Sequence, residues 1–189
     1  MHLPWWHKLQ RQVRVNSLPP SKDDFKDRII RYRQIRIGVI GRRIGRSRRR
    51  FTMRTKNVAA TEIAQRFVEA INAHDTDGLT KLMSSNHVFV DSLGNRFPAS
   101  AMRSGWQEYF TMVPDYWIKI DQIVSEGNAI ILFGSAGGTF VPKGGTMKPE
   151  NKWETPAVWR ALVKDGRVAE WRVYCDNEPI REKMRAAAA

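Results

Sequence analysis

The sequence has little cysteine, no long apolar run and no clustered metal ligands. A single cysteine, Cys175, excludes a disulfide within the chain, which fits a reducing compartment such as the cytoplasm. No apolar stretch reaches the roughly 18 residues that a membrane span needs, and charged residues soon after Trp5 and Trp6 argue against a secretory signal. Neither His74 nor His87 has a partner at metal-ligand spacing. We therefore expect a cytoplasmic protein with no membrane segment, no metal and no cofactor.

The positive charge of the chain is confined to one end. The formal net charge is +13, but residues 1–56 hold 17 of the 32 Lys and Arg and only 3 of the 19 Asp and Glu. Residues 57–189 are therefore close to neutral, and no basic surface for nucleic acid is expected on them. We divide the chain into a basic leader, 1–56, and a domain, 57–189.

The leader is densely charged and has little apolar surface to bury. Four interpretations stay open. It is a disordered basic tail, or an untranslated stretch before a true start at Met53, or an arginine-rich arm for nucleic acid or nuclear targeting. The fourth is an organelle transit peptide, against which Asp23, Asp24 and Asp27 count. We expect a chain that starts at Met53 to fold as well as the full chain.

The first half of the domain has the hydrophobic spacing of helices. Apolar residues recur every three or four positions from Val58 to His74, which predicts one amphipathic helix. Asp77 is placed to cap a short second helix, and Ser100 to cap a third helix that ends before Pro114. One strand, 87–91, is expected between the second and third helices.

The second half of the domain has the period of strands. Four strands are predicted, at 116–125, 129–141, 153–163 and 168–176, and a short helix at 177–185. The pair Asp165-Gly166 predicts a hairpin between the last two strands. Pro156 cannot donate to a ladder, so it predicts a bulge or a sheet edge.

This order of elements predicts an α+β domain. We expect a cone-shaped α+β barrel in which three N-terminal helices pack on a curved, mostly antiparallel sheet, with a pocket between the layers and no parallel strand pair. The outer side of such a sheet needs a cover, and we expect a homodimer through that face.

Three stretches resemble the nuclear transport factor 2-like superfamily, which includes SnoaL-like and ketosteroid isomerase-like domains. They are the end of the first helix, Ile71–Asp75, the strand Val88–Asp91 before Gly94, and the last hairpin, Trp153–Trp171. The match covers about residues 57–185. Its members include isomerases, cyclases, dehydratases, epoxide hydrolases and pure binding domains, so the resemblance implies a fold and leaves the reaction open.

The resemblance to ketosteroid isomerase places the position of the catalytic base on Asp91. In that enzyme a tyrosine and a protonated aspartate hold the enolate oxygen. The matching positions here fall on Phe67 and about Thr155, and two further tyrosine positions fall on Met83 and Phe110. Because these donors are missing, on the order of several kcal/mol of stabilisation is lost. The resemblance therefore implies that the chain is not a true steroid isomerase.

The remaining candidate site residues share faces that should point between the helices and the sheet. They either form an ordinary core or line a pocket for a small apolar molecule. The candidates are Phe67, Ile71, Phe89, Trp106, Tyr109, Phe110, Thr155, Trp159, Trp171 and Val173. Among them, Tyr109, Thr155 or a tryptophan N–H would serve as a replacement donor.

Two functions follow from these residues. The first is a cofactor-free isomerase, cyclase or dehydratase that removes a C–H proton with Asp91. The second is a non-catalytic ligand-binding or dimerisation domain, in which Asp91 caps the turn that follows it. A closed cavity of about 300 Å³ or more beside Asp91 would favour the enzyme, whereas filling of that space by Phe67, Trp106 and Trp171 would favour the second function.

Overall fold

The computed structural model describes residues 46–187, and for residues 46–57 it describes the backbone alone. Residues 1–45, and with them most of the leader, lie outside the described residues. The first described helix, α3, spans Arg46–Asn72 and so begins within the stretch assigned above to the leader. Its buried residues recur at helical spacing, as the sequence predicts: Ala60, Ala64, Phe67, Val68 and Ile71.

The helices that follow α3 begin differently from the sequence prediction. The helix α4 (Thr76–Leu82) is capped by Asp75, whose side chain accepts from the Gly78 N–H, and not by Asp77. The helix α5 (Met102–Met112) begins after a short 3-10 turn, η3 (Ala99–Ala101), and has no side-chain cap, so Ser100 does not cap it. The N-cap residue of α5 is Ala101, the last residue of η3, and its backbone is already in the right-handed helical region.

Six strands form one open sheet in the order β2-β1-β6-β5-β4-β3. They are β1 (Met83–Val90), β2 (Arg96–Pro98), β3 (Trp117–Glu126), β4 (Ala129–Thr139), β5 (Lys152–Lys164) and β6 (Arg167–Cys175). The predicted barrel is therefore wrong in one respect, because β2 and β3 are edges and the sheet does not close. The short strand β2 was not predicted, because three residues are too few to show the alternation of apolar and polar side chains that marks a strand.

The pairing of the last four strands is antiparallel, as predicted, but β1 runs parallel to β6. The expectation of no parallel pair is thus wrong at this one junction. Its cause is topological: β1 precedes the whole β3–β6 meander, and it joins the sheet beside the last strand of that meander. Pro156 lies in the interior strand β5, but the pairing with β6 begins only at Ala157, so the strand is locally an edge there.

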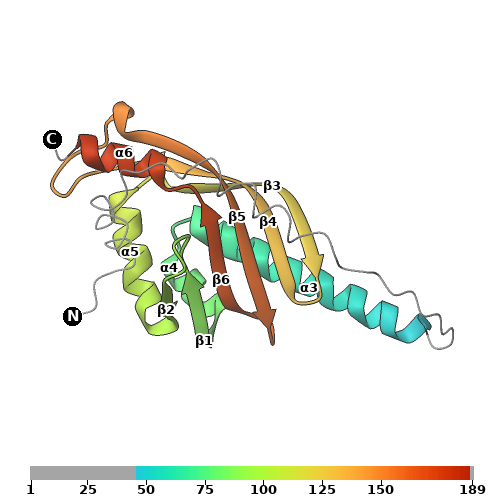
Figure 1. Ribbon diagram of the computed structural model, residues 1–189. Helices are drawn as coiled ribbons and strands as arrows, with labels where there is room; N and C mark the ends of the chain where they lie inside the picture. The colour runs from blue at the N-terminus through green and yellow to red at the C-terminus, as the bar shows by residue number, and fades with distance from the viewer. Residues whose placement is uncertain (1–45, 188–189) are drawn as a thin grey trace, which may run out of the picture.

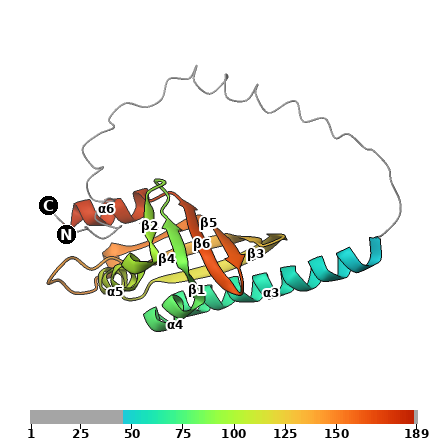
Figure 2. The same ribbon diagram turned by 90° about the horizontal axis from the view of Figure 1, so that it is seen from below.

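The helices α3, α4 and α5 lie on one face of the sheet, and α6 (Glu178–Ala186) lies near the start of β5 (Figures 1 and 2). The core fills the space between these helices and the sheet. No helix in residues 46–187 is long and apolar enough to cross a membrane.

A bulge in β3 bends the sheet over this core. The register of β3 against β4 shifts between Ile120 and Gln122, and a bulge of this kind increases local bend and twist. Gly134 lies opposite the bulge, where a Cβ atom would stand 1.9 Å from the Lys119 carbonyl oxygen. Only glycine permits this close approach of the two backbones.

Two side chains near the end of α3 position the start of β3. The Asn72 side chain donates to the Ile118 carbonyl at 2.9 Å and accepts from the Ile118 N–H at 2.8 Å. The His74 ring lies 2.9 Å from the Tyr116 carbonyl oxygen. These bonds hold Tyr116 against the inner layer, where it reaches the cavity described next.

Candidate functional site

A cavity of about 60 Å³ lies between the inner face of the sheet, α5 and α6. Seven of its sixteen lining residues are aromatic, and its polar groups come from the end of β1, from α5 and the segment after it, from β5, and from the junction of β6 and α6. The volume holds a few water molecules or a small organic group. It is well below the roughly 300 Å³ of a pocket for a drug-sized ligand.

The structure brings eight of the eleven candidate site residues together around this cavity. The aromatic ones are Phe89, Trp106, Tyr109, Trp159 and Trp171, and the others are Asp91, Thr155 and Val173. Three candidates lie elsewhere: Phe67 and Ile71 are fully buried in the core, and Phe110 stacks between His74 and Trp106. These three side chains pack in the core and do not line the cavity.

Several lining residues were not among the candidates. Trp153 and Ala157 share the strand parity of Thr155 and Trp159, so parity alone could have found them. Strand parity also covers Tyr116, Ala136 and Cys175, which lie just before β3, in β4 and at the end of β6. No strand pattern marks Ser92, Asn177 and Ile180, which come from the turn after β1 and from the start of α6.

Asp91 lies at the wall of the cavity and is 5% exposed. Its Oδ1 accepts from the backbone N–H groups of Leu93 at 2.9 Å and Asn95 at 2.8 Å. Its Oδ2 accepts from the side-chain amide of Asn95 at 2.8 Å. The carboxylate therefore caps the turn after β1, and one lone pair of Oδ2 is not engaged by these three bonds.

Two buried indole groups beside the cavity lack a hydrogen-bond acceptor. The Nε1 atoms of Trp153 and Trp171 are buried and have no partner among the described residues, and both side chains line the cavity. Buried donors are nearly always paired in folded proteins.

Other polar groups of the wall stay neutral or are already engaged. Burial raises the pKa of the Tyr109 and Tyr116 hydroxyls well above the ordinary tyrosine value, so both keep their protons. Burial also raises the pKa of the Cys175 thiol to about 11, which keeps it from acting as a thiolate at neutral pH. The Thr155 hydroxyl donates to the Asp176 carbonyl at 3.1 Å and does not replace the missing oxyanion donor.

His87 is a residue of β1 whose side chain is buried in the core and does not line the cavity. It is 1% exposed, and its Nδ1–H donates to the Val168 carbonyl at 2.8 Å while Nε2 has no partner among the described residues. Desolvation is the main cause that lowers the pKa of this imidazole below 6.5, against smaller raising effects of Val168 and Glu170. No group of three His, Cys, Asp or Glu within residues 46–187 could hold a metal ion.

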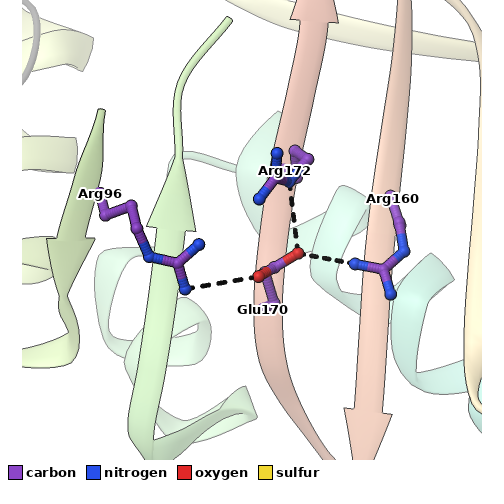
Figure 3. A network of polar contacts seen from close by, with 4 residues as sticks. All are labelled: Arg96, Arg160, Glu170 and Arg172. Carbon is purple, nitrogen blue, oxygen red and sulfur yellow. Dashed lines mark hydrogen bonds and ion pairs between the residues drawn. The ribbon is translucent and has the colours of Figure 1, made fainter. Parts of the chain in front are cut away.

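The opposite face of the sheet carries an arginine cluster around one carboxylate (Figure 3). Glu170 on β6 accepts from Arg160 on β5 at 2.7 Å and from Arg172 at 3.4 Å, and Arg96 on β2 lies 3.6 Å away. Next to this cluster, Phe133 and Tyr174 are 39% and 51% exposed and flank Val158 in one transverse row. This outer face is uncovered by any helix of the described residues.

An open, bent, mostly antiparallel sheet with helices on one face and a cavity between the layers is the nuclear transport factor 2-like fold. The chain belongs to the SnoaL-like domain family, whose model matches residues 64–171. No curated protein matches the chain in sequence.

Solved structures share this fold at low sequence identity. A candidate SnoaL-like polyketide cyclase of Shewanella denitrificans OS-217 is 15% identical, has a TM-score of 0.59, and aligns over 67% of this chain and 97% of its own. A ketosteroid isomerase-like protein of Catenulispora acidiphila, solved with trimethylamine, is 14% identical over 65% and 91% of the two chains, with a TM-score of 0.56. An LEH-like epoxide hydrolase of M. tuberculosis is 18% identical over 70% and 95%, also with a TM-score of 0.56. At such identities the similarity establishes the fold alone.

Proposed function

We propose that this protein binds a small organic molecule that carries a carbonyl or similar acceptor oxygen in the cavity between α5, α6 and the sheet. The observation that carries the proposal is the pair of buried, unpartnered indole N–H groups of Trp153 and Trp171 beside that cavity. Each buried donor without an acceptor costs roughly 1–3 kcal/mol, and an acceptor oxygen of a ligand recovers part of that cost.

The rest of the wall limits the ligand to a compact and largely apolar molecule. Trp106, Trp159 and Trp171 are at most 3% exposed and surround the empty space. Only about 60 Å³ of the cavity is empty. This small volume favours binding of a small ligand over turnover of a large one. This is the second of the two functions that the sequence suggests.

A second candidate function is cofactor-free proton transfer with Asp91 as the base. The observation in its favour is that Asp91 is buried at the cavity wall, with one lone pair of Oδ2 left over by its three hydrogen bonds. A base needs such a lone pair within hydrogen-bond reach of the C–H group of its substrate. The turn-capping role of Asp91 counts against this second candidate, because a purely binding protein would also need an aspartate at this position.

Titration with cyclopentanone, followed by the NMR signals of the tryptophan indole N–H groups, tests the binding proposal. We expect one of the Trp153 and Trp171 signals to shift with cyclopentanone and not with cyclopentane. Replacing the tryptophan whose signal shifts with phenylalanine should weaken binding by roughly 3- to 10-fold, the worth of one hydrogen bond. Trp117→Phe is the matched control, because Trp117 does not line the cavity. Equal shifts with both compounds would refute the carbonyl requirement.

Exchange of the α-protons of cyclopentanone in D₂O separates catalysis from binding. If Asp91 acts as a base, the wild type accelerates the exchange, and Asp91→Asn slows it by about 10²- to 10⁴-fold while binding persists. An exchange rate that is the same in the two proteins would remove the second candidate and leave the binding function in place.

We also propose that the outer sheet face forms a homodimer contact, as expected from the sequence. Supporting this are the exposed Phe133 and Tyr174 in one row beside the Glu170 cluster (Figure 3). At micromolar concentration, light scattering after size exclusion should give the dimer mass for the wild type. Phe133→Lys should give the monomer, whereas Met147→Lys, at a loop position that is 50% exposed, should stay dimeric. A monomeric wild type would contradict the proposal.

A further inference from the structure

The outer face of β5 carries opposite charges at two levels of the strand. Trp153 and Trp159 of β5 line the cavity, so the even-numbered residues of this strand point to the opposite, outer face. The pairing of β5 with β4 continues from Lys152 to Leu162 without a shift, so this alternation is kept. Glu154 and Arg160 therefore share the outer face, six residues or about 20 Å apart along the strand.

The arginine level has a surplus of positive charge (Figure 3). Arg96, Arg160 and Arg172 have Glu170 as their only ion-pair partner among the described side chains, so three positive charges meet one negative charge. Arg160 and Arg172 are direct partners across β5 and β6, and like charges in such positions weaken a sheet. Their side chains are 34% and 30% exposed, so the surplus charge is open to a partner.

The other level has the opposite, unpaired charge. Glu154 is exposed and forms no ion pair with any described side chain. Its partner on β4 is Gly137, which has no side chain to cover it. Between the two levels lies the row of Phe133, Val158 and Tyr174. The outer face is thus an apolar row with a positive level on one side and a negative level on the other.

These charges distinguish the two ways in which a second copy can pack on this face. A two-fold axis along the strands places equal levels of the two copies over each other, so the arginine clusters would meet. A two-fold axis across the strands reverses the strands of one copy, so Arg160 of one protomer meets the partner's Glu154 when the axis passes near Ala157. Because like charges opposed at an interface are strongly unfavourable, the charges select the axis across the strands.

We propose that the homodimer forms around a two-fold axis that crosses β5 near Ala157, with Arg160 of each protomer paired to the partner's Glu154. The symmetry repeats the contact, so the dimer has two identical ion pairs. The row of Phe133, Val158 and Tyr174 packs beside the axis and shields both pairs from water, which strengthens them. The inference rests on the proposed homodimer, to which it adds the orientation of the copies and the residues that determine it.

Reversal of either charge tests the inference on the full chain, with the dimer dissociation constant measured by analytical ultracentrifugation. Glu154→Arg opposes two positive charges at both contacts and should raise this constant at least about tenfold. Glu69→Arg makes the same charge change at an exposed position of α3, away from the outer face, and should leave the constant unchanged. Arg160→Glu should also raise it at least about tenfold. A tighter dimer of Arg160→Glu would mean that the arginine clusters face each other, and the inference would be wrong.

Mixing the two variants gives a readout that a folding defect does not imitate. In a heterodimer of one Glu154→Arg protomer and one Arg160→Glu protomer, both contacts again join opposite charges. Native mass spectrometry of an equimolar mixture should show the heterodimer in at least about tenfold excess over either homodimer. The statistical distribution of homodimers and heterodimers would overturn the inference.

The outcomes separate this inference from the homodimer on which it rests. A monomeric wild type removes both. A dimeric wild type whose dissociation constant is unchanged by Glu154→Arg removes only the inference and leaves the homodimer in place. Circular dichroism checks the fold of each variant, because Arg160→Glu takes one hydrogen-bond donor from Glu170. If that variant does not fold, the comparison of Glu154→Arg with Glu69→Arg decides alone.

Discussion

Replacing Asp91 by alanine is expected to lower the free energy of unfolding by about 3 kcal/mol, since hydrogen bonds to a charged acceptor are worth about 1.5–3 kcal/mol each and are not additive. The mutation leaves the Leu93 N–H, the Asn95 N–H and the Asn95 side-chain amide without their acceptor. At a site that is 5% exposed, water restores these bonds only if the turn opens. Urea denaturation followed by circular dichroism measures the loss.

Asp91→Asn is the matched control for this experiment. Its side-chain oxygen can still accept from the two backbone N–H groups, and asparagine suits such a turn. We expect it to lose about 1 kcal/mol, the value of one bond, so it removes the charge and keeps the fold. If Asp91→Ala were as stable as the wild type, the carboxylate would not hold the turn, and a purely chemical role for Asp91 would gain support.

Acidification below pH 6.5 is expected to destabilise the protein through His87. The pKa of this imidazole is lowered in the folded state by burial, whereas the unfolded chain takes up its proton near 6.5. The unfolded state therefore binds more protons as the pH falls, and stability falls with it. Down to the folded pKa, the loss is at most about 1.4 kcal/mol per pH unit.

His87→Asn isolates this contribution from that of the carboxylates. The asparagine amide can replace the Nδ1–H bond to the Val168 carbonyl, which is 2.8 Å long in the wild type, and it does not titrate. Denaturation curves of both proteins at pH 7.5 and pH 5 should show a smaller drop for the variant. An equal drop would mean that His87 is already protonated, or solvated, in the folded state.

Local pattern was sufficient to predict most of the elements. The helical stripe from Ala60 to Ile71 is the buried face of α3. Asp165 and Gly166, both at positive φ, form the hairpin turn between β5 and β6. In each case a side chain's neighbours along the chain determine its role. Boundaries and caps were less predictable, because Asp75 and Asp77 are equally good caps by residue type.

Strand parity likewise predicted much of the cavity wall. Phe89, Asp91, Thr155, Trp159 and Trp171 point to one side of the sheet because side chains alternate along a strand. Parity says which face a residue occupies, but not whether a second layer fills the space in front of it. The apolar face of a helix has the same limit, so Phe67 on α3 and Phe110 on α5 were grouped with the wall, although they pack elsewhere in the core.

The sequence by itself determined an α+β domain with helices on one face of a mostly antiparallel sheet and an inward carboxylate at the end of β1. Only the tertiary structure decided that β1 pairs in parallel with β6, that the sheet stays open, and that α6 brings Ile180 to the cavity. The physical reason is the range of the interactions. Periodicity, caps and turns act over a few residues, whereas strand order and cavity size depend on contacts between segments about 80 residues apart, such as His87 and Val168.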